Sequence, residues 1–141
     1  MKQKPLTEEE RNILVAYRIQ RARETLAEAD NLIKGNYYNA TVNRLYYACY
    51  YAVIALLIKN NIAAQTHQGV RQMFSLHYIA NNKINKRYSI FYGRLFNDRM
   101  SGDYDDFVQY DSEMINALRP QAEEFISVIE EILNLKIINN Q

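Results

Sequence analysis

The segment from residue 37 to residue 60 constrains the fold of this chain more than any other part of the sequence. Its apolar residues cover most of the circumference of a helix, and such a helix belongs at the centre of a protein with other helices around it. The chain holds only four Gly and two Pro, and its strongest hydrophobic periodicities lie near 3.6 residues, so strands have little room. The sequence therefore predicts an all-α protein built around this helix.

The same segment carries polar side chains that a purely structural core helix would avoid. They are one amide, one guanidinium and four phenols, contributed by Asn43, Arg44, Tyr46, Tyr47, Tyr50 and Tyr51. A buried polar group without a partner costs on the order of 1–3 kcal/mol, so each of these groups needs a partner. We therefore expect the central helix to organise polar chemistry along a seam of the bundle.

A long helix is expected before the central one. Thr7 and Glu10 have the spacing of a capping box, which starts a helix over residues 8–34, and Gly35-Asn36 ends it with a left-handed residue. The apolar residues of this helix lie mostly on one face. The charged residues on its other face are Arg11, Arg18, Arg21 and Glu24.

Three helices are expected after the central one. Thr66 is the expected cap of a helix that runs to about residue 80. A shorter helix should end near Met100, where Ser101-Gly102-Asp103 breaks the period and a tight turn follows. Asp111-Ser112 can cap a last helix over about residues 111–135. This helix contains Pro120, which should kink it or mark a late start.

Together these segments predict an up-and-down bundle of four main helices plus one short helix. With 141 residues the chain is long enough for one domain, residues 1–141, and we expect residues 1–6 and 136–141 to be flexible ends.

Composition excludes several classes of protein. Lys and Arg number 17 against 16 Asp and Glu, so bulk charge does not point to nucleic acid or membrane, and any basic site must be local. The lone Cys49 excludes an intramolecular disulfide and suits a reducing compartment. We find no apolar run of the roughly 18 residues that span a bilayer. We therefore expect a cytoplasmic protein with no membrane partner.

Three short segments combine polar or charged residues with helix seams and helix ends. They read Asn43-Arg44-x-Tyr46-Tyr47-Ala48, Thr66-His67-x-Gly69-Val70 and Arg99-x-x-x-Asp103-Tyr104-Asp105-Asp106-Phe107. Taken together they resemble the HEPN superfamily, specifically its small standalone prokaryotic branch, which is often encoded beside minimal nucleotidyltransferases. The resemblance covers nearly the whole chain. It implies a helical bundle that dimerises and that works in a toxin–antitoxin or related defence setting.

In active members of that superfamily, an Arg-x4–6-His motif cleaves RNA without a metal. The resemblance implies that the arginine steadies the phosphate and that the histidine transfers protons. The arginine corresponds to Arg99 here, but the residue five positions later is Tyr104. An unperturbed tyrosine pKa of about 10 makes Tyr104 a poor general base at pH 7.

His67 is the candidate replacement for the missing imidazole. It takes that role if the helix that it begins lies beside Arg99, or if it acts across a dimer seam. The alternative is that Thr66 and His67 only form the cap of that helix. The candidate catalytic residues are therefore Arg99, His67 and Tyr104.

The candidate binding residues lie on the central helix and after Arg99. They are Asn43, Arg44, Tyr47, Asp103 and Asp105. The alternative for Arg44 is a buried salt bridge to a carboxylate such as Asp103, Asp105 or Asp106, which would fix the register of the helix. The alternative for the tyrosines is packing in the core and at an interface between subunits.

Three functional hypotheses remain open on the sequence. The first is a homodimeric, metal-independent endoribonuclease that acts on RNA, and the second is a non-catalytic module that binds a nucleotide or a nucleotidyltransferase antitoxin. In the second hypothesis Tyr104 accepts a nucleotidyl group. The third is a purely structural interaction bundle. No cofactor is expected, and no di-metal centre either, because neither His67 nor His77 has a Glu three residues before it.

Overall fold

The computed structural model describes residues 5–104 and 109–134, with the backbone alone for residues 100–104. Its helices are α1 (Glu8–Lys34), α2 (Tyr38–Lys59), α3 (His67–Phe74), α4 (Lys86–Tyr104) and α5 (Ser112–Ile132), and a π-helical turn, η1 (Ser75–Ile79), continues α3. These described residues contain no strand, so the predicted all-α class is confirmed.

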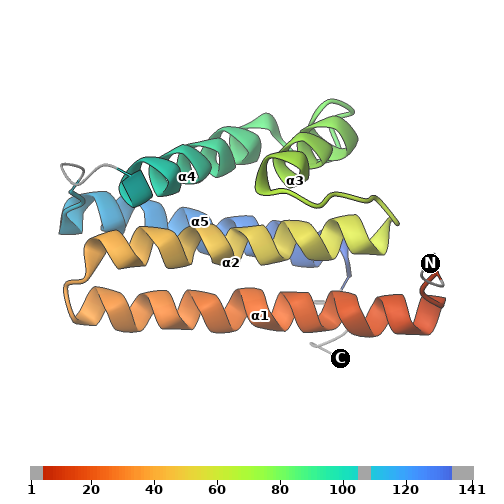
Figure 1. The fold of residues 1–141 in the computed structure, drawn as a ribbon, viewed down its shortest axis with the longest axis horizontal. Helices are drawn as coiled ribbons and strands as arrows, with labels where there is room; N and C mark the ends of the chain where they lie inside the picture. The colour runs from red at the N-terminus through yellow and green to blue at the C-terminus, as the bar shows by residue number, and fades with distance from the viewer. Residues whose placement is uncertain (1–4, 105–108, 135–141) are drawn as a thin grey trace.

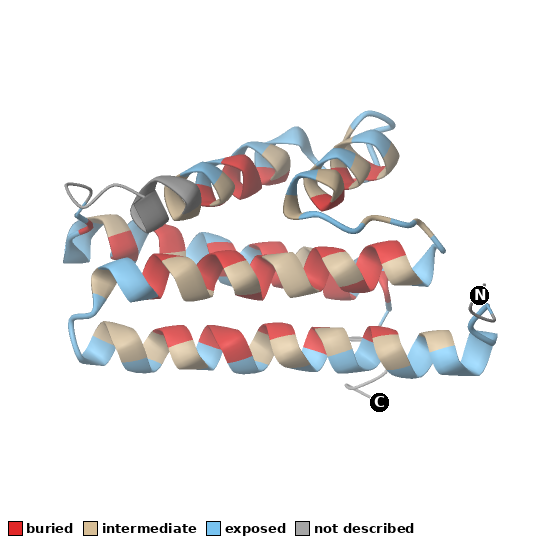
Figure 2. Cartoon of the chain, viewed as in Figure 1, coloured by how far each residue is buried: buried red, intermediate tan, exposed pale blue. Residues whose placement is uncertain are grey.

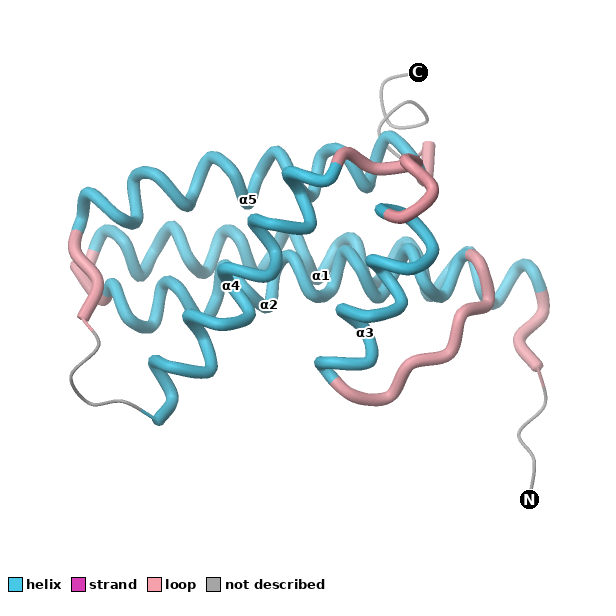
Figure 3. The backbone as a smooth tube through the Cα atoms, turned by 90° about the horizontal axis from the view of Figure 1, so that it is seen from above, coloured by secondary structure: helices cyan, strands magenta, loops and turns pink. Residues whose placement is uncertain are grey.

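Helix α2 lies at the centre of the bundle. It runs antiparallel to α1, with α5 behind it and with α3 and α4 over it (Figure 1). Seen from above, α4 crosses the other long helices obliquely (Figure 3). Buried positions line most of the length of α2 (Figure 2), and they pack against α1, α3, α4 and α5. The central position that the sequence predicts for this segment is therefore the observed one.

By length and composition alone, α2 could cross a membrane, in contrast to our expectation that no segment is apolar enough. Most of this helix is buried inside the bundle, however. Because its apolar side chains already pack against four other helices, α2 has the position of a core helix.

Three helix starts follow the predicted caps. The Thr7 hydroxyl accepts a hydrogen bond from the Glu10 amide at 3.1 Å, and the Glu10 carboxylate accepts one from the Thr7 amide at 2.9 Å, so the capping box is complete. Thr66 caps α3 by accepting from the Gly69 amide at 2.9 Å. Asp111 caps α5 in the same way, so Pro120 lies inside α5 and does not mark its start.

The predicted end of the fourth helix is wrong. Helix α4 continues through Ser101-Gly102-Asp103 to Tyr104, because Phe91, Tyr92 and Leu95 are buried and hold the helix against the core. A glycine inside a helix costs only about 1 kcal/mol, which such packing easily outweighs. The short helix of the bundle is therefore α3, and α4 is one of the four long helices.

Candidate functional site

The side chain of His67 lies against the tyrosines of α2. Its Nδ1 atom is hydrogen-bonded to the Tyr46 hydroxyl, with 2.8 Å between the heavy atoms. Its ring stacks on Tyr50, with 4.4 Å between the centroids, and meets the ring of Tyr47 edge-on at 5.7 Å. Because the Thr66 hydroxyl provides the cap of α3, His67 is not needed for that purpose. Its contacts join the first turn of α3 to α2.

The tyrosines that surround His67 form one cluster. The tyrosine cluster comprises Tyr46, Tyr47, Tyr50 and Tyr51. Successive members contact one another, with centroid distances of 5.3–6.1 Å. Tyr46 is fully buried, whereas the other three are partly exposed. One end of the cluster therefore lies in the core, and the rest of it is partly accessible to solvent along α2.

Arg99 reaches the same cluster from α4. Its Nη2 atom donates a hydrogen bond of 3.0 Å to the Tyr47 hydroxyl. Its guanidinium carbon lies 5.5 Å from the ring centroid of Tyr46 and 5.4 Å from that of Tyr47. The structure thus brings Arg99 and His67, which are far apart in the sequence, onto the same two tyrosines.

Arg44 contacts Tyr47, the tyrosine that Arg99 also contacts. Its guanidinium carbon is 5.4 Å from the Tyr47 centroid, the same distance as that of Arg99. Its Nη2 atom donates to the Asn43 side-chain oxygen at 3.0 Å, and its Nη1 atom is 3.4 Å from a carboxylate oxygen of Glu28. Among the described side chains, the carboxylate that pairs with Arg44 comes from α1, whereas the side chains of Asp103, Asp105 and Asp106 lie outside the described part of the structure.

The ion pair between Arg44 and Glu28 leaves the guanidinium accessible. The two side chains are 33% and 45% exposed, and pairs of this kind contribute about 0–1 kcal/mol because water screens them. A phosphate oxygen can compete for such a guanidinium at little cost.

Two arginines of α1 extend the positive charge around the cluster. Arg21 lies 5.6 Å from the Tyr51 centroid and pairs with Glu24 at 3.6 Å. Burial raises the pKa of Tyr50, and the nearby charge of Arg18 opposes that rise. Sequence reasoning placed both arginines on the charged face of the first helix and did not connect them with the site. Their spacing of three residues was the available signal, since it puts both on one side of a helix.

The pKa values of the central groups suit proton transfer. Burial, and then the charge of Arg99, lower the pKa of His67 below its ordinary value, so its ring is neutral at pH 7. Burial raises the pKa of Tyr46 to about 12, so its hydroxyl keeps its proton. A hydroxyl can donate or accept, so Tyr46 orients the His67 ring in either neutral tautomer. No described residue bonds to Nε2 of His67, which leaves that atom for a ligand.

The structure describes some of the other predicted site residues only in part. Asn43 orients Arg44, as described above. Asp103 and Tyr104 belong to the last turn of α4, and their side chains lie outside the described part of the structure. Asp105 lies outside the described residues altogether.

Two other kinds of site receive no support from the described residues. None of their histidines, cysteines and carboxylates gather in groups that could hold a metal ion. Cys49 is buried in α2, and burial raises the pKa of its thiol, so it does not act as a nucleophile.

What remains is a partly exposed cluster of aromatic rings with guanidinium groups on its faces and one neutral imidazole. Guanidinium groups bind anions, aromatic faces stack on planar ligands, and an imidazole moves protons near neutral pH. The arrangement is suited to an anionic ligand with planar rings.

Comparison with known proteins shows what the chain as a whole is similar to. The model of the HEPN domain matches residues 15–138. A UPF0332 protein of Thermotoga maritima is 35% identical over 124 residues, which cover 88% of this chain and 94% of that protein. Two proteins of Methanocaldococcus jannaschii, each named "Putative toxin", are 28% and 30% identical over 120 and 115 residues. These alignments cover 85% and 82% of this chain, and 82% and 85% of the two relatives.

Proposed function

Because this chain belongs to the HEPN domain family, as the match over residues 15–138 shows, we propose that it is a toxin-type HEPN protein that cleaves RNA at the tyrosine cluster. One observation carries the proposal. His67 of α3 and Arg99 of α4 both contact Tyr46 and Tyr47, which supports a shared role for the imidazole and the guanidinium although the family's sequence motif is incomplete.

Arg99 and Arg44 supply the electrostatic part of the reaction. Their guanidinium groups lie at equal distances from Tyr47, and each can bind phosphate oxygens through paired N–H donors. Negative charge grows on these oxygens as the phosphate passes through its five-coordinate state. Positive groups fixed at that place stabilise the transition state without a metal ion.

His67 supplies the proton transfer. Its neutral ring accepts the proton of the ribose 2′-hydroxyl at Nε2 while the 2′-oxygen attacks phosphorus. The bond between phosphorus and the 5′-oxygen breaks, and the leaving 5′-oxygen takes a proton from solvent. The products are a 2′,3′-cyclic phosphate and a 5′-hydroxyl. In the tautomer that this step uses, Nδ1 carries the hydrogen and donates it to the Tyr46 hydroxyl, so the lone pair of Nε2 accepts the proton.

The test is cleavage of a labelled single-stranded RNA by the full chain in the presence of EDTA. We expect fragments that end in a 2′,3′-cyclic phosphate. His67→Gln and Arg99→Gln should lower the rate by about 10²-fold or more, the usual contribution of such groups. His77→Gln is the matched control, because the His77 ring contacts none of the cluster among the described residues. RNA that stays intact with the wild-type chain, or full activity in His67→Gln, contradicts the proposal.

The alternative function is that of a modification target. Tyr104 occupies the position of the motif histidine, and the helix that carries it is the helix that carries Arg99. In this proposal a nucleotidyltransferase antitoxin transfers a nucleotidyl group to the Tyr104 hydroxyl and thereby blocks the site. Intact-mass measurement after co-expression with such an enzyme tests it. An unchanged mass, or the same added mass in Tyr104→Phe, rules it out.

We also propose that the chain acts as a cytoplasmic homodimer. The branch that it resembles dimerises, and the partly exposed tyrosines are suited to an interface because they combine apolar area with a hydroxyl. Light scattering during gel filtration measures the mass in solution directly. A monomer at micromolar concentration contradicts this part of the proposal.

A further inference from the structure

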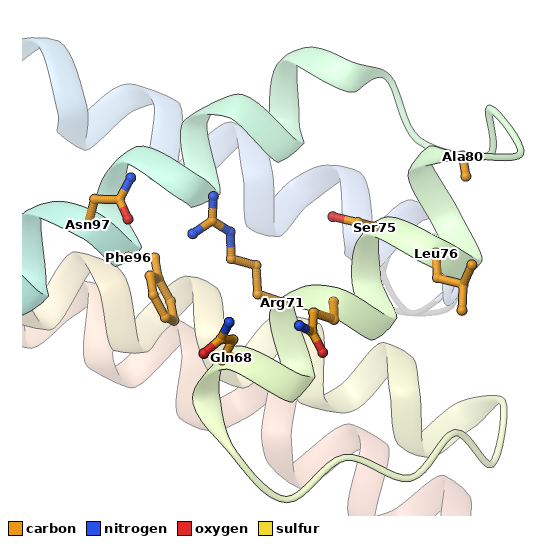
Figure 4. Close-up of a pocket in the computed structure, with 8 residues that line it drawn as sticks. Gln68, Arg71, Ser75, Leu76, Ala80, Phe96 and Asn97 are labelled. Carbon is orange, nitrogen blue, oxygen red and sulfur yellow. The ribbon is translucent and has the colours of Figure 1, made fainter.

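A cavity lies between α3–η1 and α4 (Figure 4). Its volume is about 700 Å³. The residues that line it and that matter here are Gln68, Arg71, Gln72, Ser75, Phe96 and Asn97. We call it the Arg71 groove. None of these residues belongs to the site described above.

The guanidinium of Arg71 is held in place by the surface of α4. Its carbon lies 5.0 Å from the ring centroid of Phe96. A Cβ atom on Gly93 would be 2.6 Å from Nη2 of Arg71 and 3.3 Å from its Cζ, so the guanidinium rests where only a glycine leaves room. The position of this cation is therefore fixed by the helix beneath it.

Its charge is not neutralised by that packing. The Arg71 guanidinium forms no ion pair and no hydrogen bond within the described part of the chain, although the residue is only partly exposed. An adjoining cavity of about 520 Å³ shares Arg71 and adds Lys86, Arg94 and Asp98. Asp98 pairs with Arg94 at 3.6 Å, so positive charge is in excess around the two cavities.

The donors around Arg71 suit a phosphate group. A guanidinium binds two phosphate oxygens at once, and the amides of Gln68, Gln72 and Asn97 and the hydroxyl of Ser75 can donate to the others. In Figure 4 the Arg71 side chain extends from α3 toward α4, with Phe96 and Asn97 on the opposite wall. The helix also carries a π-turn at Ser75–Ile79, a local irregularity that is frequent at functional sites.

Phe96 connects this groove with the tyrosine cluster. Its centroid is 6.0 Å from that of Tyr46 and 5.0 Å from the Arg71 guanidinium carbon. On the other wall, Gln68 directly follows His67 along α3. The Phe96 ring therefore contacts both the tyrosine cluster and the Arg71 guanidinium.

We propose that the Arg71 groove is a second phosphate subsite, which binds the RNA strand next to the nucleotide held at Arg99 and His67. The inference rests on the proposed function for its substrate. It assigns to Arg71 the binding of a neighbouring phosphate and to Gly93 the placing of that guanidinium, with no part in the chemical step.

The test is the affinity of the full chain for non-cleavable 2′-O-methyl oligoribonucleotides of increasing length. We expect Arg71→Gln to weaken the binding of an octanucleotide by about tenfold or more, since a charged hydrogen bond contributes about 1.5–3 kcal/mol. A 2′-O-methyl dinucleotide has a single bridging phosphate and cannot fill two phosphate subsites, so it should bind equally to both proteins. Arg11→Gln removes the same charge from α1 and serves as the control.

Gly93→Ala provides a second variant that keeps the charge and moves it. Alanine is a better helix residue than glycine, so α4 itself is not weakened, but the new methyl group displaces the guanidinium. We expect Gly93→Ala to weaken octanucleotide binding several-fold. Full binding in both Arg71→Gln and Gly93→Ala overturns the subsite.

The remaining outcomes separate this inference from the proposed function. If the wild-type chain cleaves RNA and Arg71→Gln binds the octanucleotide as wild type does, the subsite is wrong and the proposed function stands. If AMP or inorganic phosphate binds at Arg71 and the octanucleotide does not, the groove takes a free anion and the strand path is wrong. A change of molecular mass in Arg71→Gln with unchanged RNA binding shows that a second copy covers the groove, which also overturns the inference.

Discussion

The hydrogen bond between Tyr46 and His67 offers the sharpest test of the site. Tyr46→Phe removes one hydroxyl and leaves the ring, which stacks on Tyr92 with 5.9 Å between centroids and stays fully buried. Tyr50→Phe is a matched control. Its ring stacks on the same histidine, but its hydroxyl makes no hydrogen bond among the described residues. The two variants therefore delete the same group beside His67, and only one deletion removes a bond to it.

The magnitude follows from one hydrogen bond. A typical buried hydrogen bond contributes about 0.5–1.5 kcal/mol of net stability, which corresponds to roughly 2–6 °C in Tm for a domain of this size. For Tyr46→Phe we expect a loss in this range. The His67 ring also loses the only hydrogen bond that the described residues provide, so its orientation is less defined. A loss of up to about 1.4 kcal/mol in the transition state lowers kcat by about three- to tenfold, with KM unchanged.

Three measurements check this expectation. Thermal unfolding followed by far-UV circular dichroism gives the stability change, nitrogen-15 NMR gives the tautomer of the His67 ring, and RNA cleavage gives kcat and KM. Tyr50→Phe should stay within about 0.5 kcal/mol of the wild-type chain. Equal effects of Tyr46→Phe and Tyr50→Phe, or an unchanged His67 ring in Tyr46→Phe, would refute the role of the Tyr46 hydroxyl.

Three further predictions follow from single contacts. Thr25 and Thr41 are both fully buried, but only the Thr41 hydroxyl has a partner, the Tyr37 carbonyl at 2.8 Å. Thr25→Val should therefore raise the free energy of unfolding by about 1 kcal/mol and Thr41→Val should lower it, as denaturant titration measures. Arg99→Gln should raise the pKa of His67 in an NMR titration, with the histidine of η1 as internal reference. The Asp30 carboxylate accepts two hydrogen bonds of 2.8 Å from an arginine of α5, and these bonds lower its pKa. The stabilisation of the fold by this carboxylate is therefore present above about pH 4 and is lost as the pH falls through the pKa of Asp30 in the folded state. Asp30→Asn should flatten the acid limb of the stability curve by at most about 1 kcal/mol.

The sequence predicted those features that depend on neighbouring residues. The starts of α1, α3 and α5 were predictable, because an N-cap needs only a side chain and an amide three residues later. The end of α4 was not, because helix propensity at Gly102 is a local quantity and the burial of Leu95 is not. Local rules failed where packing between distant segments opposed them.

The sequence could not predict whether His67 and Arg99 lie close together in space. Thirty-two residues separate them, and their encounter depends on how α3 and α4 lie over α2. Periodicity gives the buried face of each helix but not the rotation of one helix against another. For the same reason Arg18 and Arg21 were assigned to a charged face, although that face borders the tyrosine cluster.

The use of tyrosine on α2 explains how a chain with a net charge of only +1 can present a cationic site. The ring of Tyr47 lies 5.4 Å from two guanidinium groups, which it attracts through its face without adding a negative charge beside them. Its hydroxyl holds one of them by a hydrogen bond. A leucine at this position would fill the space but would provide neither interaction. The aromatic side chains of the central helix thus pack in the core and also bind the arginines of the site.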